Sequence, residues 1–489
     1  MLIFKLINYQ IIRLFTAILA ILIISGCIND KGTPAYNGFP ADVGKIFFTK
    51  CSTPGCHDDA SKDAASGLSM SSWDALFAGD RGGAAVIPFR HDYSIVFSFC
   101  NTYSDLGVIN PPTMPYNKDA LSRNEVTLLE KWIDAGAPNN VGFVKFSDNP
   151  NRKKFYVVNQ GCDVVTVFDQ ATLLPMRYIN VGNSQQIESP HDIQVSPDGQ
   201  YWYVVFYNGN SIQKYRTSDD SYIGEVIIDL KHWSSLTISA DGSKGYVVDW
   251  DSNGDIAVVD LNALTVTHNI GFNYPHGSCL SPAGDTLYVT EQTGSSKLYK
   301  IPVNDFSSFT EINLYTTQPA IPLNSHVVNF SPDGSKYFVT CQGTSEVRVF
   351  QIHTDSLLAI IPVGGYPSEM DISVTHNYLF VTCEEDTLTF PGKRGSIAVI
   401  NISHNSLITT IYSGWQPHGI SVDDDKNLVY IANRNVTIGG PAPHHSSACG
   451  GKDGYVSFID MNTLTLLKLG ISDKTIELSV DPYEIAVRH

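Results

Sequence analysis

The residues best suited to chemistry lie close together near the N-terminus, in the run Cys51-Ser52-Thr53-Pro54-Gly55-Cys56-His57. Two thiols followed at once by a histidine can hold a c-type haem, because the thiols bond the porphyrin edge and the histidine ligates iron. The usual spacing leaves two residues between the cysteines, whereas four stand there in this chain. The turn-forming pair Pro54-Gly55 can tighten the longer loop and bring the sulfur atoms together.

Two other readings of this run stay open. Cys51 and Cys56 could form a disulfide, which an oxidising envelope compartment would preserve. A zinc site is less favoured, because no second Cys-x-x-Cys pair follows.

A sixth iron ligand is expected from the proline-rich loop that holds Met114. No helical apolar stripe accounts for this methionine, and a thioether opposite a histidine raises the reduction potential of a haem. His91 is the rival ligand and would give a bis-histidine site.

The elements around these ligands are expected to be helices. Residues 43–48 predict a short helix that leads into the cysteine motif. Ser122 and Glu125 have the spacing of a capping box, so a second helix should begin there. Its apolar face is followed by Gly136 and Pro138, which end it; the face consists of Val126, Leu128, Leu129, Trp132 and Ile133. We expect the Trp132 and Phe47 side chains to line the haem pocket.

Residues 40–140 resemble the short cytochrome c domains called planctomycete-type, several of which have the longer gap between cysteines. The matching pieces are the Cys-Cys-His motif, Met114-Pro115, Leu-Ser-x-x-Glu-Val from 121, and Trp-Ile-x-x-Gly-Ala-Pro from 132. The resemblance implies a small all-α domain with haem c, thioether bonds to Cys51 and Cys56, and axial ligands His57 and Met114.

The rest of the chain repeats one phrase of strand, tight turn and strand. In its first copy the turn is Ser196-Pro197-Asp198-Gly199, a typical turn sequence. The residue that opens each copy stands at positions 191, 232, 276, 326, 368, 418 and 483. Repeats of about 40–50 residues predict the four-stranded blades of a β-propeller.

The two ends of the repeat should meet. Residues 154–159 look like a second strand without a first, and residues 482–487 like a first strand without a second. Pairing them would leave no open sheet edge. We therefore predict a mainly β protein in which residues 153–489 form seven blades, six continuous and one shared. This region resembles the YVTN-type propeller repeat family.

Five of the opening residues are histidines, which should ring one mouth of the central channel: His191, His232, His276, His326 and His418. Strand direction also sends the loop at 434–453, with His444, His445 and Cys449, toward that mouth. Together they could form a second metal site. The favoured reading is that the histidines pack neighbouring blades together.

The start of the chain predicts export. Lys5 and Arg13 precede an apolar run, residues 14–24, that is too short to span a bilayer. The run ends in Ile-Ser-Gly before Cys27, which resembles a bacterial lipobox. Residues 1–26 are then a lipoprotein signal peptide, 27–39 a tether and 141–152 the linker between domains. An uncleaved anchor or an ordinary secretory signal is the alternative.

The net charge limits the kinds of partner that the protein can bind. The net charge of −17 argues against nucleic acid as a partner. We predict an electron-transfer lipoprotein of the cell envelope, anchored to a bacterial membrane by lipid, whose propeller docks a redox partner protein or a ligand. One alternative is an oxidoreductase with chemistry at the histidine face. Another is a binding protein without redox activity.

Overall fold

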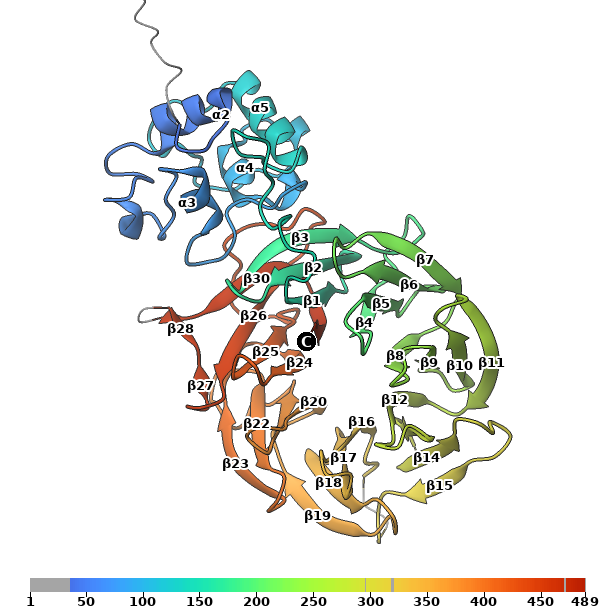
Figure 1. Ribbon diagram of the computed structural model, residues 1–489. Coiled ribbons are helices and arrows are strands. Elements are labelled where there is room, and N and C mark those ends of the chain that lie inside the picture. The colour runs from blue at the N-terminus through green and yellow to red at the C-terminus, as the bar shows by residue number, and fades with distance from the viewer. Residues whose placement is uncertain (1–35, 295, 318–320, 470–471, 489) are drawn as a thin grey trace, which may run out of the picture.

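The computed structural model describes residues 36–294, 296–317, 321–469 and 472–488, and it divides into a helical domain and a β-propeller (Figure 1). The expected signal peptide and its Cys27 lie outside these residues. Within the described ranges, no helix has the length and apolar character needed to cross a membrane.

The N-terminal domain consists of short helices joined by long loops. Its α-helices are α2 (Ala41–Ile46), α3 (Trp73–Phe77), α4 (Ile95–Cys100) and α5 (Arg123–Asp134). Three 3₁₀ turns lie between them, at Lys62–Ala64, His91–Tyr93 and Ser104–Leu106. The helix expected at 43–48 begins two residues earlier, and past Ile46 it widens into a π-helical turn, Phe47–Cys51.

Helix α5 begins as its sequence predicts. The Ser122 side chain accepts a hydrogen bond from the backbone N–H of Glu125, and the Glu125 carboxylate accepts one from the backbone N–H of Ser122. This capping box satisfies two backbone donors that the first turn leaves free. The apolar face that follows packs into the domain core, with Val126, Leu129, Trp132 and Ile133 buried.

Seven antiparallel sheets stand around a central channel, as the repeat predicts (Figure 1). The first blade combines both ends of the repeat and contains β31 (Pro482–Val487), β1 (Lys154–Asn159), β2 (Val164–Asp169) and β3 (Leu174–Asn180). The second contains β4 (Pro190–Val195), β5 (Tyr201–Phe206), β6 (Ser211–Arg216) and β7 (Tyr222–Ile227). The third contains β8 (Trp233–Ile238), β9 (Lys244–Asp249), β10 (Gly254–Asp260) and β11 (Thr265–Phe272).

The remaining four blades follow in chain order. The fourth contains β12 (Pro275–Leu280), β13 (Thr286–Glu291), β14 (Lys297–Pro302) and β15 (Thr310–Asn313). The fifth contains β16 (Ser325–Phe330), β17 (Lys336–Cys341), β18 (Glu346–Gln351) and β19 (Leu357–Pro362). The sixth contains β20 (Pro367–Ser373), β21 (Tyr378–Cys383), β22 (Ser396–Asn401) and β23 (Ser406–Ile411).

The seventh blade has a divided outer edge. Its strands β24 (Pro417–Asp423), β25 (Leu428–Asn433) and β26 (Asp453–Asp460) are regular, but β27 (Thr465–Leu466) and β30 (Thr475–Val480) both pair with β26. A small hairpin, β28 (Lys468–Leu469) and β29 (Ser472–Asp473), stands between them. This insertion, with the long loop at 434–453, explains why the last repeat is the longest.

Turn chemistry fixes the register of the two inner strands in the second blade. Gly199 N–H donates to the Ser196 carbonyl at 2.8 Å, and Gly199 has a φ of +67°. The Asp198 carboxylate accepts hydrogen bonds from the Ser196 hydroxyl and the Gln200 N–H. The turn therefore forms as its sequence predicts, since glycine readily adopts positive φ.

The ring closes by pairing the two ends of the repeat. β31 runs antiparallel to β1, with Phe155 opposite Val487 and Val157 opposite Ile485. A buried ion pair also joins the first blade to the second: the Lys154 ammonium lies 2.7 Å from the Asp220 carboxylate. The structure thus contains the predicted shared blade, which closes the ring of seven blades.

The helical domain packs against the outer edge of the first blade and the 434–453 loop (Figure 1). Tyr93 stacks on Tyr178 of β3, with ring centroids 4.1 Å apart. The Arg90 guanidinium donates to the Tyr178 carbonyl and the Asn180 side chain. Phe146, in the segment expected as a linker, is buried in the core that both domains share. Phe146 thus anchors the linker between the domains, whereas residues 147–151 are exposed.

Candidate functional site

The first candidate site is the run 51–57, which follows α2 directly. The π-helical turn buries Cys51, whose side chain is 5% exposed. His57 N–H donates to the Cys51 carbonyl at 3.1 Å, and Cys56 N–H to the Thr53 carbonyl at 2.9 Å. The longer loop thus folds back on itself. Burial, together with the nearby Cys100 and Cys56 thiols, raises the pKa of the Cys51 thiol.

Cys51 and Cys56 are both free thiols in the structure, so the disulfide considered from the sequence is not formed there. Cys100 of α4 is a third free thiol and packs in the same hydrophobic cluster as Cys51. Its burial raises the pKa of its thiol to about 12.

His57 is half-buried and has one nitrogen near a backbone carbonyl. Its Nδ1 lies 3.3 Å from the Leu68 oxygen, and burial lowers the pKa of the ring. A neutral imidazole that donates from Nδ1 keeps its lone pair on Nε2, which is the arrangement of histidine ligands in metal sites. His57 therefore has the chemistry of an axial ligand.

Met114 and the aromatic residues pack together. Met114 is partly buried against the cluster that contains Cys51, and its N–H donates to the Phe99 carbonyl. Phe47 and Trp132, the residues expected to wall a haem, have ring centroids 5.9 Å apart. The rival His91 is engaged elsewhere: its Nδ1 lies 2.8 Å from the Asp134 carboxylate at the end of α5.

The second candidate site is the channel mouth, where the repeat brings four of the five opening histidines together. His276 and His326 have ring centroids 4.1 Å apart, and Tyr483 lies 4.3 Å from His191 and 3.8 Å from His418. All four histidines are buried. The fifth, His232, precedes β8, remains half-exposed, and lies 3.6 Å from Asp251.

Burial keeps these four imidazoles neutral. It lowers the pKa of His276 to about 4 and those of His191, His326 and His418 well below the ordinary value. One of them also binds a neighbouring blade, since His418 Nδ1 lies 3.2 Å from the Tyr483 carbonyl oxygen. Neutral rings can serve either as blade contacts or as metal ligands.

A cavity of about 400 Å³ lies over the histidine ring. Its wall includes the Arg434 guanidinium, held by Asp481 at 2.7 Å and by Glu384 at 2.9 Å. Burial raises the pKa of Glu384 to about 7. A second hollow of about 350 Å³ adjoins it and shares His191, Trp250, Arg434 and Tyr483. Such a polar hollow can hold a small polar molecule.

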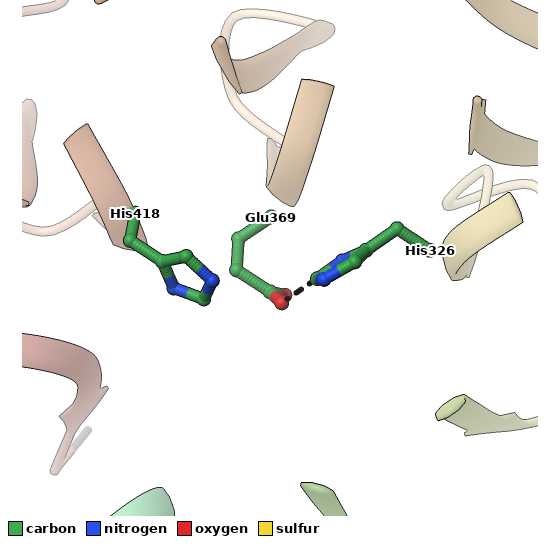
Figure 2. Close-up of side chains that lie close together, drawn as sticks. All are labelled: His326, Glu369 and His418. Atoms are coloured by element: carbon green, nitrogen blue, oxygen red, sulfur yellow. Dashed lines mark ion pairs between the residues drawn. The ribbon is translucent and has the colours of Figure 1, made fainter. Parts of the chain in front are cut away.

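The sequence analysis did not identify three acidic residues that lie next to the opening residues of their blades. Asp192, Glu369 and Glu484 each follow the residue that opens a blade. Glu369 points between His326 and His418, and its Oε1 lies 3.5 Å from His326 Nδ1 (Figure 2). Comparing the repeats one position further along the strand would have revealed these acids.

The structure does not bring the other predicted residues to the channel. His444 is 93% exposed, and His445 lies near Asp453 and Glu477, on the side of the loop that contacts Asn110 of the helical domain. Neither lines the two described cavities. The structure instead places their loop beside the helical domain, where the Ser446 N–H donates to the Asn110 side chain.

Cys449, which the sequence places in the same loop as His444 and His445, is also not at the channel as a free thiol. Cys162 and Cys449 form a disulfide across 287 residues, which ties the first blade to the 434–453 loop. Cys341 and Cys383 are fully buried among apolar side chains between blades. The first two are therefore oxidised, and the last two are enclosed by apolar side chains.

The comparisons with known proteins show the fold. No family model matches the chain. It is 22% identical over 302 residues to antigen Lp49 of Leptospira interrogans, in a match that covers 59% of this chain and 64% of that protein. The chain thus spans less than two thirds of the length of that relative.

Two solved structures have similar architecture. A functionally unknown protein from Desulfotomaculum acetoxidans has a TM-score of 0.50 and 12% identity, over 69% of this chain and 99% of the other. Hydrazine synthase of Kuenenia stuttgartiensis has a TM-score of 0.49 and 17% identity, over 63% and 91%. At these identities, similarity extends to the fold alone.

Proposed function

We propose that this protein is a membrane-tethered electron-transfer lipoprotein, with haem c in the N-terminal domain and a propeller that docks a redox partner or ligand. One observation carries the proposal: two free thiols and a neutral histidine stand together in the turn after α2, and that histidine has its Nδ1 at the Leu68 carbonyl.

The residues present fit a covalently bound haem. Cys51 and Cys56 would form the thioether bonds, and His57 and Met114 would be the axial ligands. Phe47 and Trp132 would exclude water from the ring, which helps to set the potential. When bound, haem supplies an iron that cycles between Fe(II) and Fe(III) by one electron.

The proposed location rests on the N-terminal sequence. Cleavage before Cys27 and lipidation of that cysteine would hold the protein at a bacterial membrane, facing the periplasm or the exterior. Removal of Lys5 and Arg13 with the signal peptide would make the net charge of −17 two units more negative. A basic redox partner is therefore favoured, because opposite charges accelerate encounter.

Covalent haem is tested on the full chain matured in a host with haem-attachment machinery. We expect wild-type protein to keep its haem on a denaturing gel, and Cys51→Ser/Cys56→Ser to lose it. Cys100→Ser is the matched control, since this buried thiol should not bond the porphyrin. Colourless wild-type protein from such a host would contradict the proposal that the protein binds haem covalently.

The docking role is tested with a small basic c-type cytochrome as the partner. We expect electron exchange with the reduced protein to slow steeply between 10 and 200 mM salt, roughly the range over which the Debye length falls from about 30 to 8 Å. A rate that does not depend on salt would argue against charge-guided docking.

A specific observation favours a second candidate function. The histidine ring beneath a polar cavity could bind a metal and make the protein an oxidoreductase, with the haem as an electron relay. A binding protein without redox activity is the third reading, and the gel experiment separates it from the other two.

A further inference from the structure

Three metal-ligand side chains from three consecutive blades converge in the channel. His326 comes from β16, Glu369 from β20 and His418 from β24. One potential ligand atom from each lies within 4.8 Å of the other two. Ligands at about 2.0–2.2 Å from a zinc ion stand about 3–4 Å apart. Small side-chain rotations would therefore bring all three to bonding distance.

The nitrogen atoms are available for ligation. His418 Nδ1 is directed at the Tyr483 carbonyl oxygen, so as a donor it leaves the lone pair on Nε2. His326 Nδ1 is buried and forms no hydrogen bond with any described residue. Its contact with Glu369 Oε1, at 3.5 Å, is longer than a normal hydrogen bond, and an ion between the two atoms would satisfy both. The carboxylate of Glu369, 22% exposed, points between the two rings (Figure 2).

The charge around the cluster favours a cation. Asp192 and Glu484 occupy the third position of their innermost strands, as Glu369 does in β20. The cation of the cavity wall, Arg434, is paired with Asp481 and Glu384 instead. A cation among the three acids would relieve their repulsion.

We propose that His326, Glu369 and His418 bind one divalent transition-metal ion, which keeps an open coordination position toward the 400 Å³ cavity. Two histidines and a carboxylate are a donor set for zinc and related ions, whereas calcium and magnesium prefer oxygen ligands. Three protein ligands leave room for water or a small polar molecule. This inference goes beyond the electron-transfer proposal and does not depend on haem.

The test uses the full mature chain, freed of loosely bound metal by a chelator and titrated with Zn²⁺ in a calorimeter. We expect one zinc ion per chain in addition to haem iron, and no binding of Ca²⁺ in the same titration. Glu369→Gln keeps the shape of the side chain but removes its charge. It should weaken zinc binding at least about tenfold, the lower end of the usual effect of disturbing a metal site.

His232→Gln is the control, because His232 precedes β8 and lies outside the cluster. It should bind zinc as wild type does. Folding is checked by thermal unfolding: zinc should raise the Tm of wild type and His232→Gln much more than that of Glu369→Gln. Because Glu369→Gln reduces charge repulsion in the channel, we expect it to fold.

Three results would overturn the inference: no zinc binding by wild type, equal losses in Glu369→Gln and His232→Gln, or calcium binding as tight as zinc binding. Haem is measured on the same samples. Protein that lacks haem yet binds zinc through Glu369 would refute the proposed electron transfer and leave the metal site standing.

Discussion

The two candidate sites of this protein are built in different ways. In the helical domain, Cys51, Cys56 and His57 lie within seven consecutive residues, and one helix with its widened last turn positions them. In the channel, His326, Glu369 and His418 come from three blades and meet only because the propeller is a closed ring. A site of the first kind depends on local structure, whereas one of the second kind depends on the whole domain.

Closure of the ring therefore gives a way to separate the two sites. Three features hold the first blade in place: the pairing of β31 with β1, the buried pair of Lys154 with Asp220, and the disulfide between Cys162 and Cys449. Changes to these features should disturb the channel and spare the cysteine motif.

The largest effect on stability is expected from Lys154→Met. The variant leaves the buried Asp220 charge unpaired, which costs about 3–5 kcal/mol of unfolding free energy. Denaturant titration of the propeller measures this loss, and haem attachment should not change. Lys153→Met is the control, because its ion pair with Asp425 is exposed and should be worth less than about 1 kcal/mol. Equal losses in the two variants would contradict the assignment of closure to the buried pair.

Removal of the disulfide should have the next largest effect. Cys162→Ser/Cys449→Ser is expected to lower the unfolding free energy by about 2–4 kcal/mol, because the bond constrains a long loop of the unfolded chain. Reductant should destabilise wild type to a similar extent and leave the double variant unchanged. If reductant shifted both proteins alike, the bond would have no such role.

The helical domain should respond to changes of its iron ligand instead. Met114→His is expected to lower the haem reduction potential by on the order of 100 mV, because a thioether ligand favours Fe(II) more than imidazole does. Potentiometric titration measures the shift, and Lys154→Met should not show it. His91→Gln serves as the comparison and should retain the wild-type potential. A shift in His91→Gln alone would make His91 the ligand.

The last effect is the pH dependence of the unfolding free energy, which involves Glu384 in the cavity wall. The pKa of Glu384 is raised from 4.5 to about 7 in the folded chain, chiefly by burial. Between these values the folded state holds a proton that the unfolded state has lost. The stability that the Glu384 carboxyl group contributes is therefore fully present below pH 4.5 and is lost as the pH rises toward 7.

Glu384→Gln should flatten this decline by about 3 kcal/mol, measured as unfolding free energy against pH. Glu385→Gln, at the half-exposed neighbouring position, should keep the wild-type slope. A wild-type slope in Glu384→Gln would show that Glu384 titrates normally.

Local patterns were enough to predict most of the fold. The serine-proline-aspartate-glycine turns set two strands in register, because proline and glycine restrict the backbone whatever surrounds them. The capping box of Ser122 and Glu125 works within one turn of helix, so it too was predictable. The regular spacing of the opening residues predicted seven blades. The incomplete blades at the two ends of the repeat predicted that these ends pair and close the ring.

The sequence by itself thus determined the propeller, two of the helices of the N-terminal domain, α2 and α5, and the position of the cysteine motif. Only the tertiary structure decided which histidines meet. His232 is half-exposed because it precedes β8, in which Ser234 has the strand position that His326 has in β16. The tertiary structure also brought Glu369 between two imidazoles, paired Cys162 with Cys449, and placed His445 beside Asp453 and Glu477. The first two of these contacts join residues from different blades, and their geometry follows from how the blades pack, which no local pattern encodes.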